Sequence, residues 1–177
     1  NDEALSLPYE RVVGLLGEVG WEDYRRGDYR YDVCNYAAMR GSVRVLKWTR
    51  ENNLPWDIQT CSTAAHNGHL PALQYLHENG CPRDSEACLW AAQNGHLPVL
   101  QYLHENGYPW DSDPCSAAAY HGHLPALQYL HENGCPWNSL TCLWAADSKH
   151  WDCLQYAVDN KCPDWEIHAK EHAEHLR

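Results

Sequence analysis

Residues 69–80 read HLPALQYLHENG, and the same stretch returns at 96–107, with Val99 in place of an alanine, and unchanged at 123–134. A cysteine repeats at the same interval of 27 residues. It occupies positions Cys34, Cys61, Cys88, Cys115 and Cys142. A fixed period of this length is the signature of a solenoid, in which each unit packs only on its neighbours. The period therefore predicts a repeat array with extended faces instead of one central core.

One unit, residues 88–114, reads as helix, turn, helix and loop. Its first helix is expected over residues 88–94, where Cys88, Ala91 and Ala92 share one face at helical spacing. Small side chains on that face let neighbouring helices approach closely. No segment shows the strict alternation of an exposed strand, so the fold class predicted is all-α.

The second helix of this unit is expected to begin near Pro98, because proline lacks an N–H that the first helical turn does not use. Gly107 ends it, as glycine does just after a helix. Residues 108–114 form the connector, and Asp113 is the expected N-cap of the next helix.

We expect five repeats between two capping segments. The repeats span 34–60, 61–87, 88–114, 115–141 and 142–165, with an N-terminal cap over 1–33 and a C-terminal capping helix over 166–177. The fifth repeat departs from the pattern, since Lys149 and Lys161 replace the two glycines. Such change is expected of a terminal repeat, because one of its sides meets water.

The run AAQNGHLPVL at residues 91–100 resembles an ankyrin repeat, which has two alanines, two variable residues, Gly-His-Leu and a second helix ending in glycine. The match recurs at 64–73 and 118–127 and covers residues 34 to about 165. Each unit is about six residues shorter than the usual ankyrin repeat, and the family's Thr-Pro-Leu-His opening is absent. The shortfall lies in the connector, where ankyrins carry a β-hairpin. The resemblance thus implies an ankyrin-like helical solenoid of helix-turn-helix repeats with shortened or absent β-hairpins.

Ankyrin repeats are overwhelmingly non-catalytic protein-binding modules, so the resemblance implies a protein partner. Comparing the five units shows variation at four first-helix positions and in the connectors. In an ankyrin stack the first helices line the concave side, and the connectors border it. The predicted protein-binding residues are Tyr36, Arg40, His66, Asn67, Arg83, Leu89, Trp90, Gln93, Asn94, Trp110, Tyr120, His121, Leu143 and Trp144.

Two interpretations of the first-helix tryptophans stay open. Trp90 and Trp144 flank Ala117 in the stack, and the notch between them would accept an apolar side chain of a partner. Alternatively, the two rings only fill space between adjacent first helices. Trp, Tyr and Arg are the usual hot-spot residues of interfaces.

The connector tryptophans favour a structural interpretation, because Trp follows Pro in three of the five units, as a packing element would. These are Trp56, Trp110 and Trp137. Arg83 interrupts this series and is therefore the better binding candidate within the connectors.

The protein is acidic, with 13 Lys and Arg against 24 Asp and Glu, a net charge of −11. Such a charge repels phosphate backbones, which argues against nucleic-acid binding. No stretch approaches the roughly 18 apolar residues of a membrane helix, so no direct membrane insertion is expected.

The nine cysteines follow the repeat instead of pairing. Equivalent residues of stacked repeats lie about 8–10 Å apart, whereas a disulfide needs Cα atoms within about 7 Å. The first cysteine of each unit is therefore predicted to be reduced and buried. This favours a reducing, intracellular location, either the cytoplasm or an organelle after removal of a targeting segment.

Twelve histidines raise the question of metal binding. The turn histidines, His69, His96, His123 and His150, make structural hydrogen bonds in the family that the chain resembles. His168, His172 and His175 share one helix face, which suits a transition metal. Glu171 and Glu174 beside them indicate a solvated capping helix, and no metal or other cofactor is expected.

Two further functions are compatible with the sequence. The chain would serve equally as a structural or linker subunit of a larger assembly. The segment from Leu7 to Leu16 faintly resembles the start of an F-box, and the alternative function is a substrate-binding adaptor of a ubiquitin ligase. An enzyme is not expected, because no phosphate loop, nucleophile elbow or paired-carboxylate signature is present.

Overall fold

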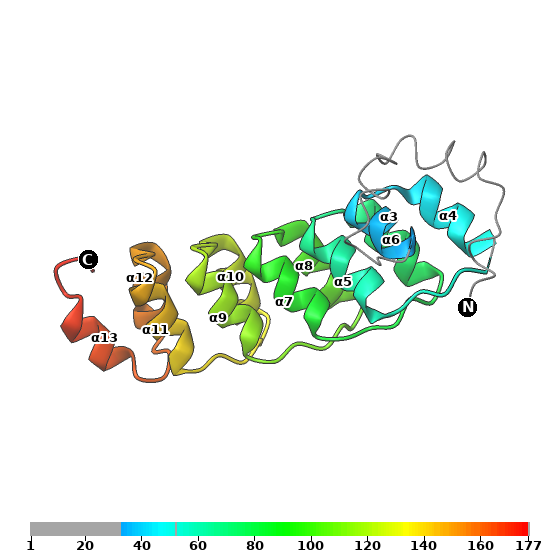
Figure 1. Ribbon diagram of the computed structural model, residues 1–177. Helices are drawn as coiled ribbons and strands as arrows, with labels where there is room; N and C mark the ends of the chain where they lie inside the picture. The colour runs from blue at the N-terminus through cyan, green and yellow to red at the C-terminus, as the bar shows by residue number, and fades with distance from the viewer. Residues whose placement is uncertain (1–32, 52, 177) are drawn as a thin grey trace. The chain divides into compact units, whose positions relative to one another are not determined.

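The computed structural model describes residues 33–51 and 53–176, and every regular element within these ranges is an α-helix (Figure 1). The chain divides into two compact units, Asn1–Pro82 and Arg83–Arg177. The first contains α3 (Val33–Met39), α4 (Val43–Glu51), α5 (Ile58–His66) and α6 (Leu70–Glu78). The second contains α7 (Glu86–Gln93), α8 (Leu97–Glu105), α9 (Asp113–Tyr120), α10 (Leu124–Glu132), α11 (Ser139–Asp147), α12 (Trp151–Asp159) and α13 (Trp165–Glu171).

Within each unit the helices stack as pairs. In the second unit, α9 packs against α7 and α11, and α10 packs against α8 and α12, so first and second helices form separate rows (Figure 1). In the first unit, α3 packs on α5 and α4 on α6. The described part of the chain holds no strand, and its connectors carry no β-hairpin. The predicted ankyrin-like helical solenoid is confirmed.

The core follows from the small residues of the first helices and the branched residues of the second. Cys88, Ala91 and Ala92 of α7 are fully buried, which lets the first helices approach closely. Leu100 and Leu103 of α8 are also fully buried and represent the apolar stripe of the second helices. The same pattern recurs in each repeat, as a solenoid requires.

Successive repeats interlock at the turn between the two helices. Gly95 has a φ of +68°, and a Cβ built on it would lie 2.6 Å from Nδ1 of His123 in the next repeat. The turn histidine of another repeat is also hydrogen-bonded to the repeat before it, since Nε2 of His69 lies 3.0 Å from the Met39 carbonyl oxygen. The structural hydrogen bond that the resemblance implied for this histidine is therefore present. In the fifth repeat the same turn position is Lys149, also at positive φ (60°).

All nine cysteines are buried and none of them is in a disulfide, which confirms the prediction for the first cysteine of each repeat. Burial raises the pKa of the Cys88 thiol to about 12. The cysteines of the connectors have a second use, because each Sγ donates to a carbonyl oxygen of the preceding connector. The distances are 3.5 Å from Cys81 to Asp57, 3.1 Å from Cys135 to Asp111 and 3.2 Å from Cys162 to Asn138.

Helix boundaries differ from the sequence-based expectation at several points, and α7 begins at Glu86, two residues before the expected start at Cys88. Helix α9 begins at Asp113, so Ser112 and not Asp113 is the N-cap residue. Pro114 does not stop this earlier start, because the first helical turn needs no N–H from it. Helix α13 ends at Glu171, well short of the end of the predicted capping helix. The N-terminal cap and the F-box-like segment lie outside the described residues, apart from Val33.

Candidate protein-binding surface

The predicted binding positions on the first helices of the second unit remain accessible. We call this set the first-helix face. It consists of Leu89, Trp90, Gln93, Asn94, Tyr120, His121, Leu143 and Trp144. Tyr120, His121 and Trp144 are exposed, and the others are half-buried. The face thus carries large side chains that the repeat core does not enclose.

Two aromatic rings stand out on this face. Tyr120 is 45% exposed and Trp144 is 37% exposed. Their ring centroids lie 5.6 Å apart at an interplanar angle of 88°, an edge-to-face pair that joins α9 to α11. The His121 ring lies 4.9 Å from the Tyr120 ring. Tyr120 therefore adds a ring beside Trp144 that the predicted notch did not include.

The asparagines at the ends of two first helices are partly engaged. Asn94 Nδ2 donates to the Trp90 carbonyl at 2.9 Å, and Asn67 Nδ2 donates to the Thr63 carbonyl at 2.8 Å. The same two carbonyls also accept the backbone N–H of these asparagines, at 3.2 Å in each case, so each side-chain amide adds a second hydrogen bond at the helix end. Their amide donors are thus turned toward their own helices.

In the first unit the structure places the four predicted residues differently from one another. Arg40 and His66 are exposed, whereas Asn67 is half-buried. Tyr36 is only 7% exposed, so its ring is not available to a partner. The prediction counted positions along one helix, and it took no account of what packs beside that helix.

The connector tryptophans pack against the second helices. Trp137 stacks on the His131 ring at a centroid distance of 3.8 Å, and Trp110 stacks on His104 at 4.3 Å. His131 Nδ1 is hydrogen-bonded to the Tyr156 hydroxyl of the next repeat at 2.9 Å. This ladder of rings agrees with the structural interpretation. It means that Trp110, although predicted as a binding residue, is held by His104.

Arg83 also makes contacts within the second compact unit, with residues of the repeat that follows it. Its Nη1 donates to the Asn106 carbonyl at 3.0 Å, and its guanidinium lies 5.9 Å from the centre of the Tyr108 ring. The side chain is nevertheless exposed. Arg83 therefore contacts the end of α8 in the next repeat, whereas Trp110 and Trp137 stack on the second helix of their own repeats.

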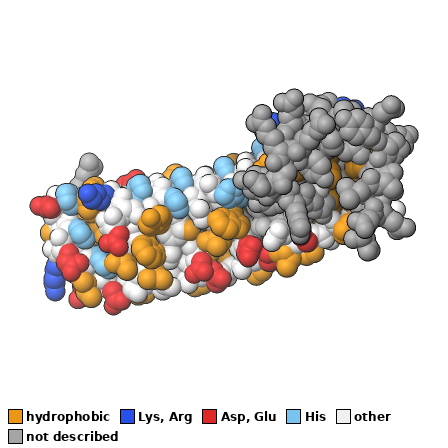
Figure 2. Space-filling view, in the orientation of Figure 1, with side chains coloured by type: hydrophobic (Ala, Val, Ile, Leu, Met, Phe, Trp, Pro, Cys, Tyr) orange, Lys and Arg blue, Asp and Glu red, His pale blue; other side chains and the backbone are white. Residues whose placement is uncertain are grey.

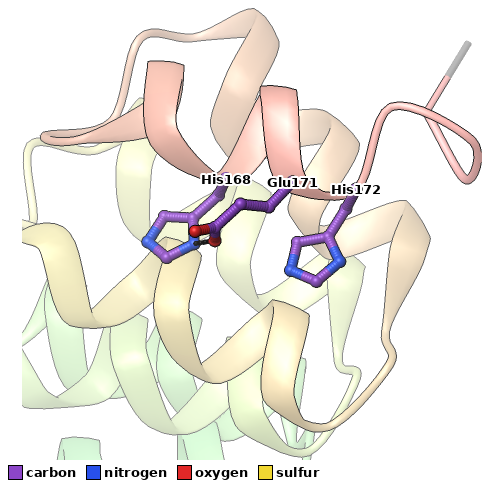
Figure 3. Close-up of side chains that lie close together, drawn as sticks. All are labelled: His168, Glu171 and His172. Carbon is purple, nitrogen blue, oxygen red and sulfur yellow. Dashed lines mark ion pairs between the residues drawn. The ribbon is translucent and has the colours of Figure 1, made fainter.

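Three side chains of the C-terminal helix gather in one place (Figure 3). One ligand atom each from His168, Glu171 and His172 lies within 4.8 Å of the other two. His168 is buried, and its Nδ1 lies 3.8 Å from Oε2 of Glu171. His175, which shares their face in the sequence, instead stacks on Trp151 at 4.0 Å. The structure therefore brings together a different trio from the one that the histidine spacing suggested.

Comparison with known families decides the fold family. A model of ankyrin repeats in three copies matches residues 88–165, and a model of ankyrin repeats in many copies matches residues 61–104. This chain is an ankyrin repeat protein. Ankyrin repeats generally mediate protein–protein interaction and are typically non-catalytic, and neither matching model describes an enzyme. The family signal comes from the same segments that carry the repeated Gly-His-Leu turn.

A solved structure shows the same fold. The crystal structure of the human ASB11 ankyrin repeat domain matches with a TM-score of 0.65 and 17% sequence identity. The match covers 75% of this chain and 70% of that one. At this identity the likeness speaks for the architecture alone. The comparison with curated proteins gave no match.

The charge of the second unit is strongly negative. Residues 83–177 contain 13 Asp and Glu and 5 Lys and Arg, a net charge of −8 with histidines neutral. On the face drawn in Figure 2, acidic side chains alternate with hydrophobic patches along the described helices of this unit. None of the helices described is both long and apolar enough to cross a membrane.

Proposed function

We propose that this ankyrin repeat protein is a non-catalytic interaction module whose second unit binds a protein partner through the first-helix face. The observation that carries the proposal is the exposure of Tyr120 and Trp144 on adjacent first helices. The aromatic residues of the connectors, by contrast, are stacked on the second helices. The repeat core therefore explains one set of rings and leaves the other uncovered.

The exposed pair is large enough to dominate an interface. A fully enclosed Tyr or Trp buries about 150–250 Å², so exposed fractions of 45% and 37% leave roughly 150 Å² of side chain open to a partner. At about 25 cal/mol per Å², covering that surface is worth up to about 4 kcal/mol. Tyr and Trp are enriched among hot-spot residues, and their truncation typically costs 2 kcal/mol or more.

The charge of the unit indicates what surrounds the apolar contact on the partner. A net charge of −8 favours a surface that carries Lys or Arg around an apolar side chain. Complementary charge mainly raises the association rate, and added salt screens it. The expected partner is therefore a protein with a basic rim, whose binding slows as ionic strength rises.

The proposal includes two modes of partnership. A module that docks transiently exchanges its partner, whereas a structural or linker subunit holds it permanently. A competition experiment separates them, since unlabelled protein displaces a transient partner within minutes and leaves a permanent assembly intact. No observation on the described residues favours the ubiquitin-ligase adaptor over either mode.

Affinity capture from an extract of the source cells tests the proposal. The bait is wild-type protein beside the double variant Tyr120→Ala/Trp144→Ala, with far-UV circular dichroism to show that both are folded. The matched control is Tyr102→Ala on α8, which removes a ring from a second helix. The proposal expects a partner held by wild type and by the control and lost by the double variant. A partner held equally by all three baits would refute the first-helix face as the binding site.

A further inference from the structure

We propose that His168, Glu171 and His172 form a zinc-binding site at the C-terminal end of the repeat stack. The three residues are three, four and one positions apart on the last turn of α13 and the residue after it. One helical turn therefore presents two imidazoles and a carboxylate on the same side (Figure 3). Two nitrogens and one oxygen are a ligand set that zinc accepts.

The distances require only a small closure. The three ligand atoms lie within 4.8 Å of one another, whereas ligands of a tetrahedral zinc ion, each about 2.0–2.2 Å from the metal, lie about 3.4 Å apart. Glu171 is exposed and His172 is half-buried, so both side chains have room to rotate toward His168. The buried His168 would then be the fixed point of the site.

The environment of His168 is the second argument. Its ring is buried, yet its polar contact with Glu171 spans 3.8 Å, which is too long for a hydrogen bond. Burying a polar group without a hydrogen bond is unfavourable, and a metal ion bound to this ring would remove that cost. The expectation of no metal rested on a solvated helix, and the burial of His168 does not fit that picture.

Neighbouring rings limit the site to three protein ligands. His175 stacks on Trp151 at 4.0 Å, and His172 lies 5.5 Å from the same indole. The stack on Trp151 fixes the His175 ring, and its Nε2 lies 3.2 Å from Oε1 of Glu174, so His175 is held away from the trio and the fourth position of the metal is left to water. An open position of this kind is typical of sites that are not purely structural.

Zinc binding would also stabilise the end of the stack. Helix α13 has seven residues, which is too short to be stable by itself, and it packs on α11 and α12. A metal ion that joins His168 to His172 would favour the helical conformation of this last turn, because the two ligands lie one turn apart only in a helix. Binding and the folding of this cap are therefore expected to be coupled.

Calorimetric titration of tag-free, chelator-treated full-length protein with zinc chloride tests the proposal. We expect one equivalent with a Kd of about 1–10 µM and a rise in melting temperature of about 5 °C at a hundredfold excess over Kd. His172→Ala and Glu171→Gln should each weaken this event by 10-fold or more and reduce the thermal shift at the same zinc concentration to about half or less. His175→Ala is the matched control and should change the Kd by less than about 2-fold.

Cobalt gives an independent readout. A cobalt complex of this site should show visible absorption bands of a tetrahedral ion in wild type and His175→Ala, and none in His172→Ala. The proposal is overturned if 100 µM zinc gives no stoichiometric event. It is equally overturned if His172→Ala binds as wild type does, or if His175→Ala alone removes binding. None of these results depends on the protein partner, so the zinc site and the proposed function fail separately.

Discussion

Replacing Gly95 with alanine tests the interlock between repeats. Gly95 ends the first helix of its repeat at a φ of +68°, a conformation that costs an alanine about 1–2 kcal/mol. The new Cβ would also lie 2.6 Å from Nδ1 and 2.8 Å from Cγ of His123, where carbon contacts are normally about 3.5–4.0 Å. The ring cannot retreat freely, because it is part-buried and bonded to the Gln93 backbone.

The magnitude follows from the two terms. Overpacking of this kind costs about 1–3 kcal/mol, so Gly95→Ala should lower the free energy of unfolding by about 2–5 kcal/mol. Gly134 is the matched control, since its φ is +80° and nothing lies within 4 Å of its built Cβ. Gly134→Ala should therefore show only the backbone cost, about 1–2 kcal/mol.

Urea unfolding followed by circular dichroism measures both variants. His123→Ala in the Gly95→Ala background should recover the steric part, which a double-mutant cycle isolates. Equal losses for Gly95→Ala and Gly134→Ala, with no coupling to His123, would refute the interlock.

Three further predictions concern the second unit. Burial lowers the pKa of His123 below its ordinary 6.5, so the contribution of the neutral ring to stability is complete above pH 6.5 and is lost as the pH falls below it. The free energy of unfolding should therefore fall less between pH 7.5 and pH 5.5 in His123→Gln than in wild type. An identical fall in both proteins would contradict this. Burial raises the pKa of Cys88 and of Cys153 to about 12, so iodoacetamide at pH 8 should alkylate neither thiol before the protein unfolds. Mass spectrometry that shows both thiols modified at the rate of a free cysteine would contradict this prediction. Trp137→Ala removes the stack on His131 and should lower the free energy of unfolding by about 1–3 kcal/mol without weakening binding of the partner. A variant that is as stable as wild type and has lost binding would show that Trp137 is a binding residue and not a packing residue.

Much of the architecture could be predicted because each repeat must pack on its neighbours in the same way, so the same residue types recur at the same positions. The Cys-Ala-Ala face and the glycine turn recur at fixed spacing, and each is explained by contacts with the neighbouring repeat. In the fifth repeat Lys149 replaces the turn glycine, because α13 follows this repeat and there is no further helix pair to pack against the turn.

The candidate site was less accessible to sequence reasoning, because exposure depends on what lies beside a helix. Tyr36 occupies the same offset as Trp90 and Trp144, yet it is buried while Trp144 is exposed. Offsets along one helix cannot distinguish these cases. The edge-to-face contact of Tyr120 with Trp144 joins different offsets of adjacent repeats, so comparison at equal offsets did not pair them.

The trio at the C-terminus shows a related limit. The spacing of the histidines selected His175, because it shares a face with His168 and His172 on a continuous helix. The helix ends at Glu171, so the chain turns away and His175 reaches Trp151 instead. Glu171 takes its place at a spacing that suits the same helical turn equally well.

The affinity of the purified partner for wild type and for Tyr120→Ala/Trp144→Ala tests the central claim most directly. Calorimetry should show the double variant at least about 30-fold weaker, the equivalent of 2 kcal/mol, with Tyr102→Ala unchanged within about 2-fold. A double variant that is folded and binds as wild type does would contradict the account, because the exposed rings of the first-helix face would then have no part in recognition.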